Sequence, residues 1–417
     1  MGSSRKAALS FIFVTVLLDM LAFGIIAPVL PRLILSFQHS DVARTSETMG
    51  WFVSTWALMQ FVFAPVLGML SDRFGRRPVV LLSNFGLGLD YVIMALAPTL
   101  PWLFAGRVLS GLTASSMPTA NAYLSDVLPP EKRAKAFGIF GAAFGVGFVL
   151  GPAIGGWMGA INPRLPFWIA AGFSLANACY GFFVLPESLP RERRARQFKW
   201  GKANPVGSLR LLRSHHELFG LAAVNFLAYL AHEVYATVFV LYCTARYGWS
   251  QGQLGASLAL VGVATMLVSA VVVGWSVKRF GEWASLYLGM GLAMVGFILF
   301  GAAPAGWLFM VGILVNAFWS LASAPSQALM TRRVGPSEQG ELQGALGSMR
   351  GIAMVLGPGM FSVTFAFFMR PGHLLPGAPW YLAALLLLAA IGIAIRVSPA
   401  TAPPQPGVVE LQSAEAD

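Results

Sequence analysis

The sequence predicts an all-α integral membrane protein, with twelve transmembrane helices arranged as two pseudo-symmetric six-helix bundles. The first observation is composition: 57% of the residues are hydrophobic, 11% are charged and the mean hydropathy is +0.69. These values lie outside the range of soluble globular domains. The second is the number of apolar runs that reach the roughly 20 residues a membrane helix needs. The third is a repeat that relates the two halves of the chain.

Twelve apolar runs are predicted to be membrane helices, because they exceed strand length and lack the polar alternation of a β-barrel. They cover residues 9–30, 49–70, 78–97, 101–123, 136–158, 166–185, 217–240, 253–275, 284–302, 307–329, 343–367 and 379–396. Minimal connections at residues 98–101 and 304–307 predict antiparallel hairpins.

A step of 206 residues relates the two halves without gaps. It carries Arg73-Phe74-Gly75 to Arg279-Phe280-Gly281, and Gly151-Pro152 to Gly357-Pro358. Duplicated membrane units of this kind build transporters, with a site where the halves meet. We expect a first bundle over 1–187, a basic cytoplasmic linker over 188–215, a second bundle over 216–397 and a disordered tail over 398–417.

The formal net charge of +11 is predicted to set the topology. With the N-terminus in the cytoplasm, inner loops and tails hold 21 of the 28 Lys and Arg residues, and outer loops hold five. The positive-inside rule then places both termini in the cytoplasm of a multi-pass inner (plasma) membrane protein. The basic linker is expected to touch anionic lipid headgroups, and no aromatic platform for nucleic acid accompanies it.

No enzymatic chemistry is indicated. The two cysteines, Cys179 and Cys243, form neither a disulfide framework nor a metal cluster. No phosphate-binding loop of the Walker type is present, so ATP hydrolysis is not expected. We expect no cofactor or metal, a proton gradient as the energy source, and a monomer.

Ionisable residues inside the predicted spans are the candidates for function, because a charge at the bilayer centre costs about 3 kcal/mol on insertion scales. They are Asp19, Asp90, Arg107, His232, Glu233 and Arg350. Asp90 and Arg107 flank the turn at 98–101 at similar depth, so we expect them to pair, either as a static ion pair or as a proton-exchanging one. Without that partner, desolvation would favour the neutral acid.

The other ionisable residues have no obvious partner in the sequence. Asp19 is expected to bind a proton or substrate, with a helix-packing carboxylate as the alternative. His232 and Glu233 are about 100° apart around a helix, so one is expected to face the cavity and the other a neighbouring helix. Both are candidates for proton coupling, with a structural hydrogen bond as the alternative. Arg350 is expected to pair with a carboxylate or to contact substrate.

The substrate path is expected to combine apolar and hydrogen-bonding side chains. Besides Asp19 and Arg350, its candidates are Gln60, Tyr91, Asn121, Asn225, Phe226, Tyr229 and Phe318. Gly151 and Pro152 interrupt the fifth span. They predict a glycine face that serves either static packing or bending, and the latter reading makes them candidates for gating.

The loop from Gly68 to Pro78 resembles the signature of the major facilitator superfamily between spans 2 and 3. The segments Leu18-Asp19, Pro28-Val29-Leu30-Pro31 and Gly151-Pro152-Ala153-Ile154-Gly155-Gly156 are similar to drug/proton antiporters. Further segments resemble the tetracycline-efflux class, among them Ala57-Leu58-Met59-Gln60-Phe61, Asp90-Tyr91, Gly106-Arg107 and Gln339-Gly340-Glu341-Leu342-Gln343-Gly344. The resemblance implies a gate at the cytoplasmic face built by Gly68, Asp72, Arg73, Gly75 and Arg76, with Asp72 central. Lys278 takes the place of that acid in the second half.

The resemblance also has gaps. Tetracycline exporters carry a histidine in span 8 and an aspartate in span 9, and those places fall near Thr265 and Ala293 here. We therefore expect a proton-coupled antiporter that exports small amphipathic drugs by alternating access, of tetracycline-like or other chemistry. The alternatives are a proton-coupled importer of a small metabolite and a non-transporting membrane receptor.

Overall fold

The computed structural model describes residues 2–128, 130–195, 207–209, 211–212, 216–335, 338–373 and 375–398. Every regular element among these residues is helical. The predicted linker lies partly outside them, at residues 196–206, 210 and 213–215, and the predicted disordered tail lies outside them from residue 399 onward. The predicted domain boundaries therefore stay predictions.

The described residues of the first half form eight α-helices. They are α1 (Gly2–Ile26), α2 (Leu30–Phe37), α3 (Val42–Phe74), α4 (Arg76–Leu96), α5 (Leu100–Thr113), α6 (Ser116–Val127), α7 (Pro130–Ile161) and α8 (Leu165–Val184). Short 3-10 turns η1 (Arg191–Arg193) and η3 (Gly207–Leu209) follow.

The second half is more interrupted. Its helices are α10 (His216–His232), α11 (Val234–Thr237), α12 (Phe239–Tyr247), α13 (Gln251–Leu267), α14 (Val273–Ala302), α15 (Gly306–Asn316), α16 (Ser320–Thr331), α17 (Gln339–Met369) and α18 (Ala378–Val397). A π-helical turn, η4 (Val268–Val272), joins α13 to α14, and a 3-10 turn, η5 (Ala317–Trp319), joins α15 to α16.

Ten helical stretches of the described residues are long and apolar enough to cross a membrane. One of them, Gln251–Ala302, is 52 residues long and bends sharply at Gly281, so it supplies two spans. The pair α5 and α6 supplies another, because the break at residues 114–115 leaves each piece too short to qualify alone. The architecture is therefore consistent with the predicted twelve spans.

The 206-residue repeat is visible in the backbone. Gly75 ends α3 with φ of +112°, and its copy Gly281 interrupts α14 with φ of +84°. Only glycine adopts such values without steric cost. Each copy turns the chain from one span into the next at the same place in its half.

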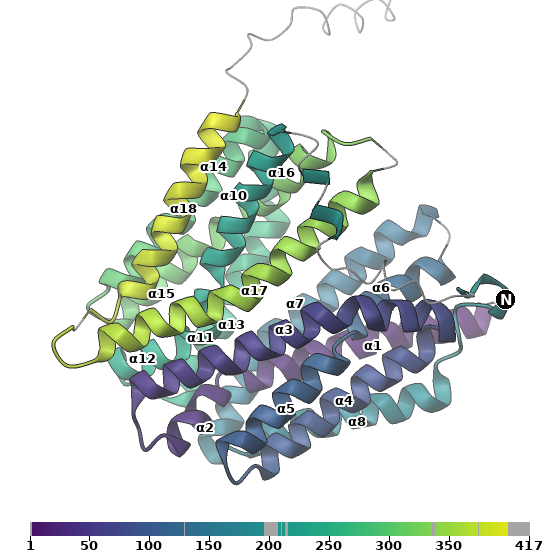
Figure 1. Ribbon diagram of the computed structural model, residues 1–417, viewed down its shortest axis with the longest axis horizontal. Coiled ribbons are helices and arrows are strands. Elements are labelled where there is room, and N and C mark those ends of the chain that lie inside the picture. The colour runs from purple at the N-terminus through teal and green to yellow at the C-terminus, as the bar shows by residue number, and fades with distance from the viewer. Residues whose placement is uncertain are drawn as a thin grey trace, which may run out of the picture.

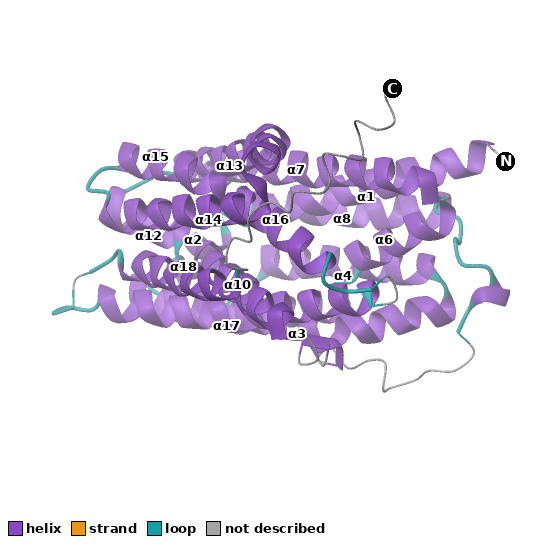
Figure 2. Ribbon diagram, turned by 90° about the horizontal axis from the view of Figure 1, so that it is seen from above, coloured by secondary structure: helices purple, strands orange, loops and turns teal. Residues whose placement is uncertain are grey.

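Figure 1 shows the helices in two groups, one from each half of the chain, and Figure 2 shows the same helices from above. In Figure 1 the groups meet beside α2, α11 and α12, and they diverge toward the ends where α1 begins and α18 finishes. We call the first region the closed end and the second the open end. The largest apolar core contains side chains from both groups, among them Phe52, Met94, Phe239 and Phe361.

Two helix pairs make most of the contacts between the groups: α3 with α17, and α7 with α13. Small residues allow both approaches. A Cβ atom built on Gly156 of α7 would lie only 2.8 Å from Cα of Gly255 in α13. One built on Gly50 of α3 would lie 2.7 Å from Cβ of Ser362 in α17. Backbones this close are typical of small-residue interfaces between membrane helices.

Three polar contacts tie the two groups together at the closed end. An Arg32 Nη2 atom donates to the carbonyl oxygen of Trp249 at 2.9 Å, and the Ser46 hydroxyl donates to the Ser362 carbonyl at 3.1 Å. Arg370 and Glu47 form an ion pair at 2.8 Å. All three join residues more than 200 positions apart in the sequence, so each of them links the two halves directly.

Candidate functional site

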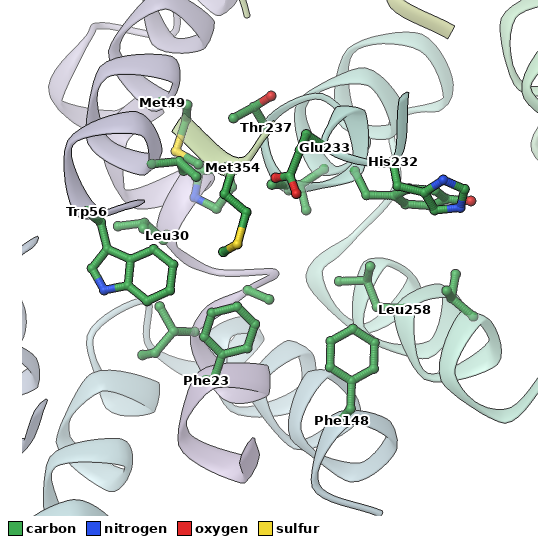
Figure 3. Close-up of a pocket in the computed structure, with 18 of the residues that line it drawn as sticks. Phe23, Leu30, Met49, Trp56, Phe148, His232, Glu233, Thr237, Leu258 and Met354 are labelled. Carbon is green, nitrogen blue, oxygen red and sulfur yellow. The ribbon is translucent and has the colours of Figure 1, made fainter. Parts of the chain in front are cut away.

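A cavity of about 430 Å³ lies between the two groups of helices, within the size range of ligand pockets. Side chains of α1, α3, α4, α5 and α7 form one side, and those of α10, α11, α13, α15, η5 and α17 form much of the other. Figure 3 shows the labelled part of this lining, which is mainly aromatic and aliphatic. The lining includes Phe23, Trp56, Tyr91, Arg107, Phe148, His232, Glu233, Tyr235, Asn316 and Trp319.

Glu233 occupies the break between α10 and α11. Its backbone N–H donates to the Leu230 carbonyl, three residues back, instead of continuing the helical pattern. Its side chain packs against Gly357 of α17, where an added Cβ would meet the Glu233 Cγ at 2.7 Å. Figure 3 shows the carboxylate directed into the cavity. Among the described residues it has no hydrogen bond or ion pair, and Arg350 attracts it only from a distance.

His232 lines the opposite side of the same break. Its ring stacks on Trp319 with 3.9 Å between ring centroids, and it meets Phe297 edge to face at 5.3 Å. The Nδ1 atom lies 3.3 Å from the Ala228 carbonyl oxygen. In Figure 3 the side chains of His232 and Glu233 point apart, as their spacing predicts, yet both border the cavity.

Asp90 and Arg107 form the predicted pair. Arg107 of α5 donates to Oδ2 of Asp90 in α4. The Asp90 side chain is fully buried, whereas that of Arg107 is 11% exposed and borders the cavity. The acid is therefore separated from the cavity by its own cation.

Asp19 lies in α1 and is 3% exposed. The Ser116 hydroxyl at the start of α6 is within reach of its carboxylate, but neither carboxylate oxygen has a hydrogen bond of normal geometry. The residue is not among those that line the cavity. It is a buried, unpaired acid inside the first group of helices.

The places where the tetracycline-efflux class carries its second-half titrating groups are occupied differently. Thr265 lines the cavity, whereas Ala293 is fully buried and is not among the lining residues. The Asn316 amide donates to the Ala293 carbonyl at 3.1 Å, and the Tyr235 hydroxyl donates to Oδ1 of Asn316 at 2.8 Å. A neutral chain of hydrogen bonds thus lies beside His232 in this region.

Of the nine residues predicted to bind substrate, Tyr91 lines the cavity. The other eight lie elsewhere: Asp19, Gln60, Asn121, Asn225, Phe226, Tyr229, Phe318 and Arg350. The Asn225 amide donates to the sulfur of Met330 at 3.6 Å, and Phe318 packs against a buried apolar cluster that includes Ala264 and Leu321. Arg350 makes no ion pair within the described residues, and its guanidinium lies 5.7 Å from the centre of the Tyr229 ring.

The predicted gating loop forms a compact charge network within the first half. Arg76 donates to Asp72, and its Nε donates to Asp126 at 3.0 Å. Glu187 accepts the backbone N–H of Arg76 at 2.8 Å, which caps the start of α4. Arg73 is exposed beside the ring of Phe74, and Gly68 has no neighbour within 4 Å of an added Cβ.

Gly151 and Pro152 lie within α7, which continues through the proline as one helix. They pack against α1, where a Cβ on Gly24 would meet Cδ of Pro152 at 2.8 Å. The glycine face therefore makes close contacts in two directions, to α1 within the first group and to α13 of the second.

Several lining residues were not among the predicted substrate contacts, namely Phe23, Met49, Trp56, Phe148 and Met354. They are apolar residues in apolar spans, and the sequence does not tell which face of such a helix meets lipid and which meets a cavity. Only the aromatic and methionine content of α1, α3, α7 and α17 could have drawn attention to them.

The family follows from comparison with known proteins. The model of the Major Facilitator Superfamily matches residues 12–358, more than three quarters of the chain. This protein belongs to the Major Facilitator Superfamily. Its fold, with all described elements helical and two halves around a central cavity, is that of the superfamily's transporters.

Two of the curated relatives that match this chain are tetracycline resistance proteins. The tetracycline resistance protein, class C, of Escherichia coli is 38% identical over 91% of this chain and 94% of its own length. The class D protein of Salmonella ordonez is 35% identical over 94% of this chain and 98% of its own length.

A solved structure supports the fold alone, since identity is low. A bacterial homologue of the human lysosomal transporter Spinster, in an inward-facing and occupied conformation, superposes with a TM-score of 0.74 at 18% identity, over 95% of this chain and 97% of that one.

Proposed function

We propose that this protein is a proton-coupled antiporter that exports small amphipathic drugs by alternating access. One observation carries the proposal: a mainly apolar cavity between two groups of helices is bordered by an unpaired carboxylate, Glu233, and by the cation of a buried acid pair. Ionisable groups inside a membrane mark ion pathways. The similarity to tetracycline resistance proteins supports export of drugs rather than uptake of nutrients.

The charge distribution supports an orientation in which both termini lie in the cytoplasm of the inner membrane. In that orientation the closed end faces outward, and the cavity belongs to an inward-facing state. The contacts of α3 with α17 and of α7 with α13 then close the cavity to the outside of the cell. We propose that the two groups rock about these two helix pairs, with Gly151 and Pro152 close to the pivot.

Proton exchange is assigned to the acids. Protonation of Asp90 would weaken its bond to Arg107 and free that cation at the cavity wall. Asp19 is a second acceptor, because it is buried and, among the described residues, its carboxylate has no ion pair and no hydrogen bond of normal geometry. Glu233 faces the cavity directly and is the acid that substrate and proton can both reach. His232 is held beside it by Trp319 and serves as a relay.

Gating at the cytoplasmic face is assigned to the Asp72, Arg76 and Asp126 network. In the described residues this network holds α3, α4 and the end of α6 together at the open end. We propose that the second half approaches this network when the transporter turns outward. Because Lys278 stands where the first half has Asp72, the two halves cannot close by identical contacts.

Transport in inverted membrane vesicles tests the proposal. A proton gradient that is acidic inside the vesicles should load tetracycline or a fluorescent drug into vesicles that contain the protein, because protons leave as drug enters, and a protonophore should abolish the loading. Asp90→Asn vesicles matched for protein content serve as the comparison and should lose most of the gradient-driven signal. Efflux driven by the same gradient would instead identify an importer, and no movement across a broad panel would favour a receptor.

A further inference from the structure

The charges around the cavity do not balance locally. Arg107 borders it but is already bonded to Asp90, so this pair is neutral as a whole. Asp19 is buried away from the lining. Glu233 is left as the carboxylate that borders the cavity without an ion pair among the described residues.

The surroundings of Glu233 suit an organic cation. Trp319 and Tyr235 lie on the same half, and Phe23, Trp56 and Phe148 face them from the first half. Aromatic faces attract cations, and they do so more strongly where water is excluded. In Figure 3 the rings of Phe23, Trp56 and Phe148 surround the space into which the Glu233 carboxylate points.

We propose that the cavity selects hydrophobic monocations, with the positive centre of the ligand beside the Glu233 carboxylate and its apolar groups among the aromatic rings. The inference rests on the proposed function and names the chemical class of its substrate. A proton and the ligand compete for the same carboxylate, so binding of one displaces the other. Exchange of drug for proton then follows from occupancy of a single group.

Other charged or titratable groups around Glu233 are consistent with this assignment. Arg350 of α17 attracts the carboxylate but lies outside the lining, over the ring of Tyr229. His232 is held between Trp319 and the Ala228 carbonyl, and Tyr235 is bonded to Asn316. Tyr91 of α4 and Arg107 of α5 complete the set on the facing wall.

Gly357 makes room for the acid. An added Cβ there would contact the Glu233 side chain at its Cγ, 2.7 Å away. Gly357→Ala should therefore displace the carboxylate without removing its charge, and it should weaken cation binding to an intermediate extent. Gly357 acts as a positioning residue, because it does not line the cavity itself.

Equilibrium binding to the full-length purified protein tests the proposal with three ligands, of which the two ions have nearly the same shape and the neutral molecule is slightly smaller. Tetraphenylphosphonium is a cation, tetraphenylborate an anion and triphenylphosphine oxide a neutral molecule. We expect the wild type to bind the cation at least about tenfold more tightly than the other two. Glu233→Gln should lose at least about tenfold in affinity for the cation and be unchanged for the neutral compound, while Glu233→Asp should keep part of the preference.

Glu341→Gln is the matched control, because it neutralises an exposed acid at the start of the same α17 that contacts Glu233. It should bind all three ligands as the wild type does. Affinity for the cation should fall as the pH is lowered from about 8 to about 6, and the neutral compound should show no such trend. Thermal unfolding of each variant in detergent would show whether a loss of binding reflects a loss of fold.

Two results would overturn the inference: equal cation affinity in Glu233→Gln and the wild type, or equal binding of the anion or neutral compound by the wild type. If the binding pattern holds while vesicles transport nothing, the proposed function fails and the cation site stands. If vesicles export drugs while Glu233→Gln binds the cation normally, export stands and this site is wrong.

Discussion

Arg107 of α5 is bonded to Asp90 of α4 across the hairpin that joins these two helices, and the pair separates a fully buried acid from the central cavity. The arrangement places a titratable group one side chain away from the space where a substrate would bind. Its two members are expected to respond differently to substitution.

Asp90→Asn should reduce proton-driven export at least tenfold and leave the amount of protein in the membrane near that of the wild type. The amide oxygen of asparagine still accepts a hydrogen bond from Arg107, but it cannot exchange a proton. Drug resistance of cells, normalised to membrane abundance by immunoblot, measures both effects. Undiminished resistance at equal abundance would remove Asp90 from the coupling mechanism.

Arg107→Leu should be more damaging to the fold, because it leaves Asp90 buried without its cation. Breaking a buried pair in this way costs about 3 to 5 kcal/mol. Thermal unfolding of the purified variant should show a lower midpoint than that of Asp90→Asn. Adding Asp90→Asn to Arg107→Leu should recover part of the loss, whereas purely additive losses would show that the two side chains are not coupled.

Gly255→Val should prevent α7 and α13 from closing. A Cβ on Gly255 would lie 3.0 Å from Cα of Gly156, and the contacting atom is backbone that cannot move aside. After Cys179 and Cys243 are replaced, a cysteine introduced at Val240 in the cavity lining should become more reactive to an impermeant maleimide added from outside. Gly252→Val is the control on the same helix, since an added Cβ meets nothing there within 4 Å.

The polar contacts of the closed end should differ in the free energy that they contribute to keeping it closed. Arg32→Met removes a partly buried charged hydrogen bond to the Trp249 carbonyl, of a kind worth about 1.5 to 3 kcal/mol. Arg370→Met breaks an exposed ion pair with Glu47, a class worth at most about 1 kcal/mol. The first change should raise outside labelling of the Val240 cysteine clearly and the second only slightly. The reverse order would mean that the rim ion pair holds the end closed.

Arg76→Lys should impair export although it preserves the charge. Arg76 reaches Asp72 through Nη1 and Asp126 through Nε at the same time, and a lysine ammonium lacks the forked geometry to do so. Arg73→Lys provides the comparison, because Arg73 is exposed, its guanidinium lies beside the Phe74 ring, and it forms no ion pair among the described residues. Similar export by the two variants would indicate that the loop needs only positive charge.

The sequence predicted the architecture well because the bilayer imposes long apolar helices and the duplication repeats their turns. Gly75 and Gly281, which the repeat relates, both have a positive φ. The spacing of Asp90 and Arg107 around their hairpin predicted the ion pair that forms. Short-range spacing is enough for such a pair, since adjacent antiparallel helices bring equal depths together.

The cavity lining was harder to predict. Phe23, Trp56 and Phe148 lie in spans that are apolar on every face, so periodicity does not separate lipid-facing from cavity-facing positions. Asn225 and Phe318 have suitable chemistry but pack against their neighbours instead. Helix rotation within a bundle depends on contacts between distant segments, and a single sequence does not contain that information.

The few polar ties across the closed end have a consequence for the energy of the transport cycle. One neutral hydrogen bond, worth about 1 kcal/mol net, one charged hydrogen bond, worth about 1.5 to 3 kcal/mol, and one solvent-exposed ion pair join the halves there. One elementary charge crossing a potential of 100 mV releases about 2.3 kcal/mol, which is of the same size. The glycine surfaces beneath them separate without any change of rotamer, because they have no side chains to disengage. The free energy released by a single ion moving down its gradient is thus comparable to most of the free energy needed to break the polar contacts of the closed end.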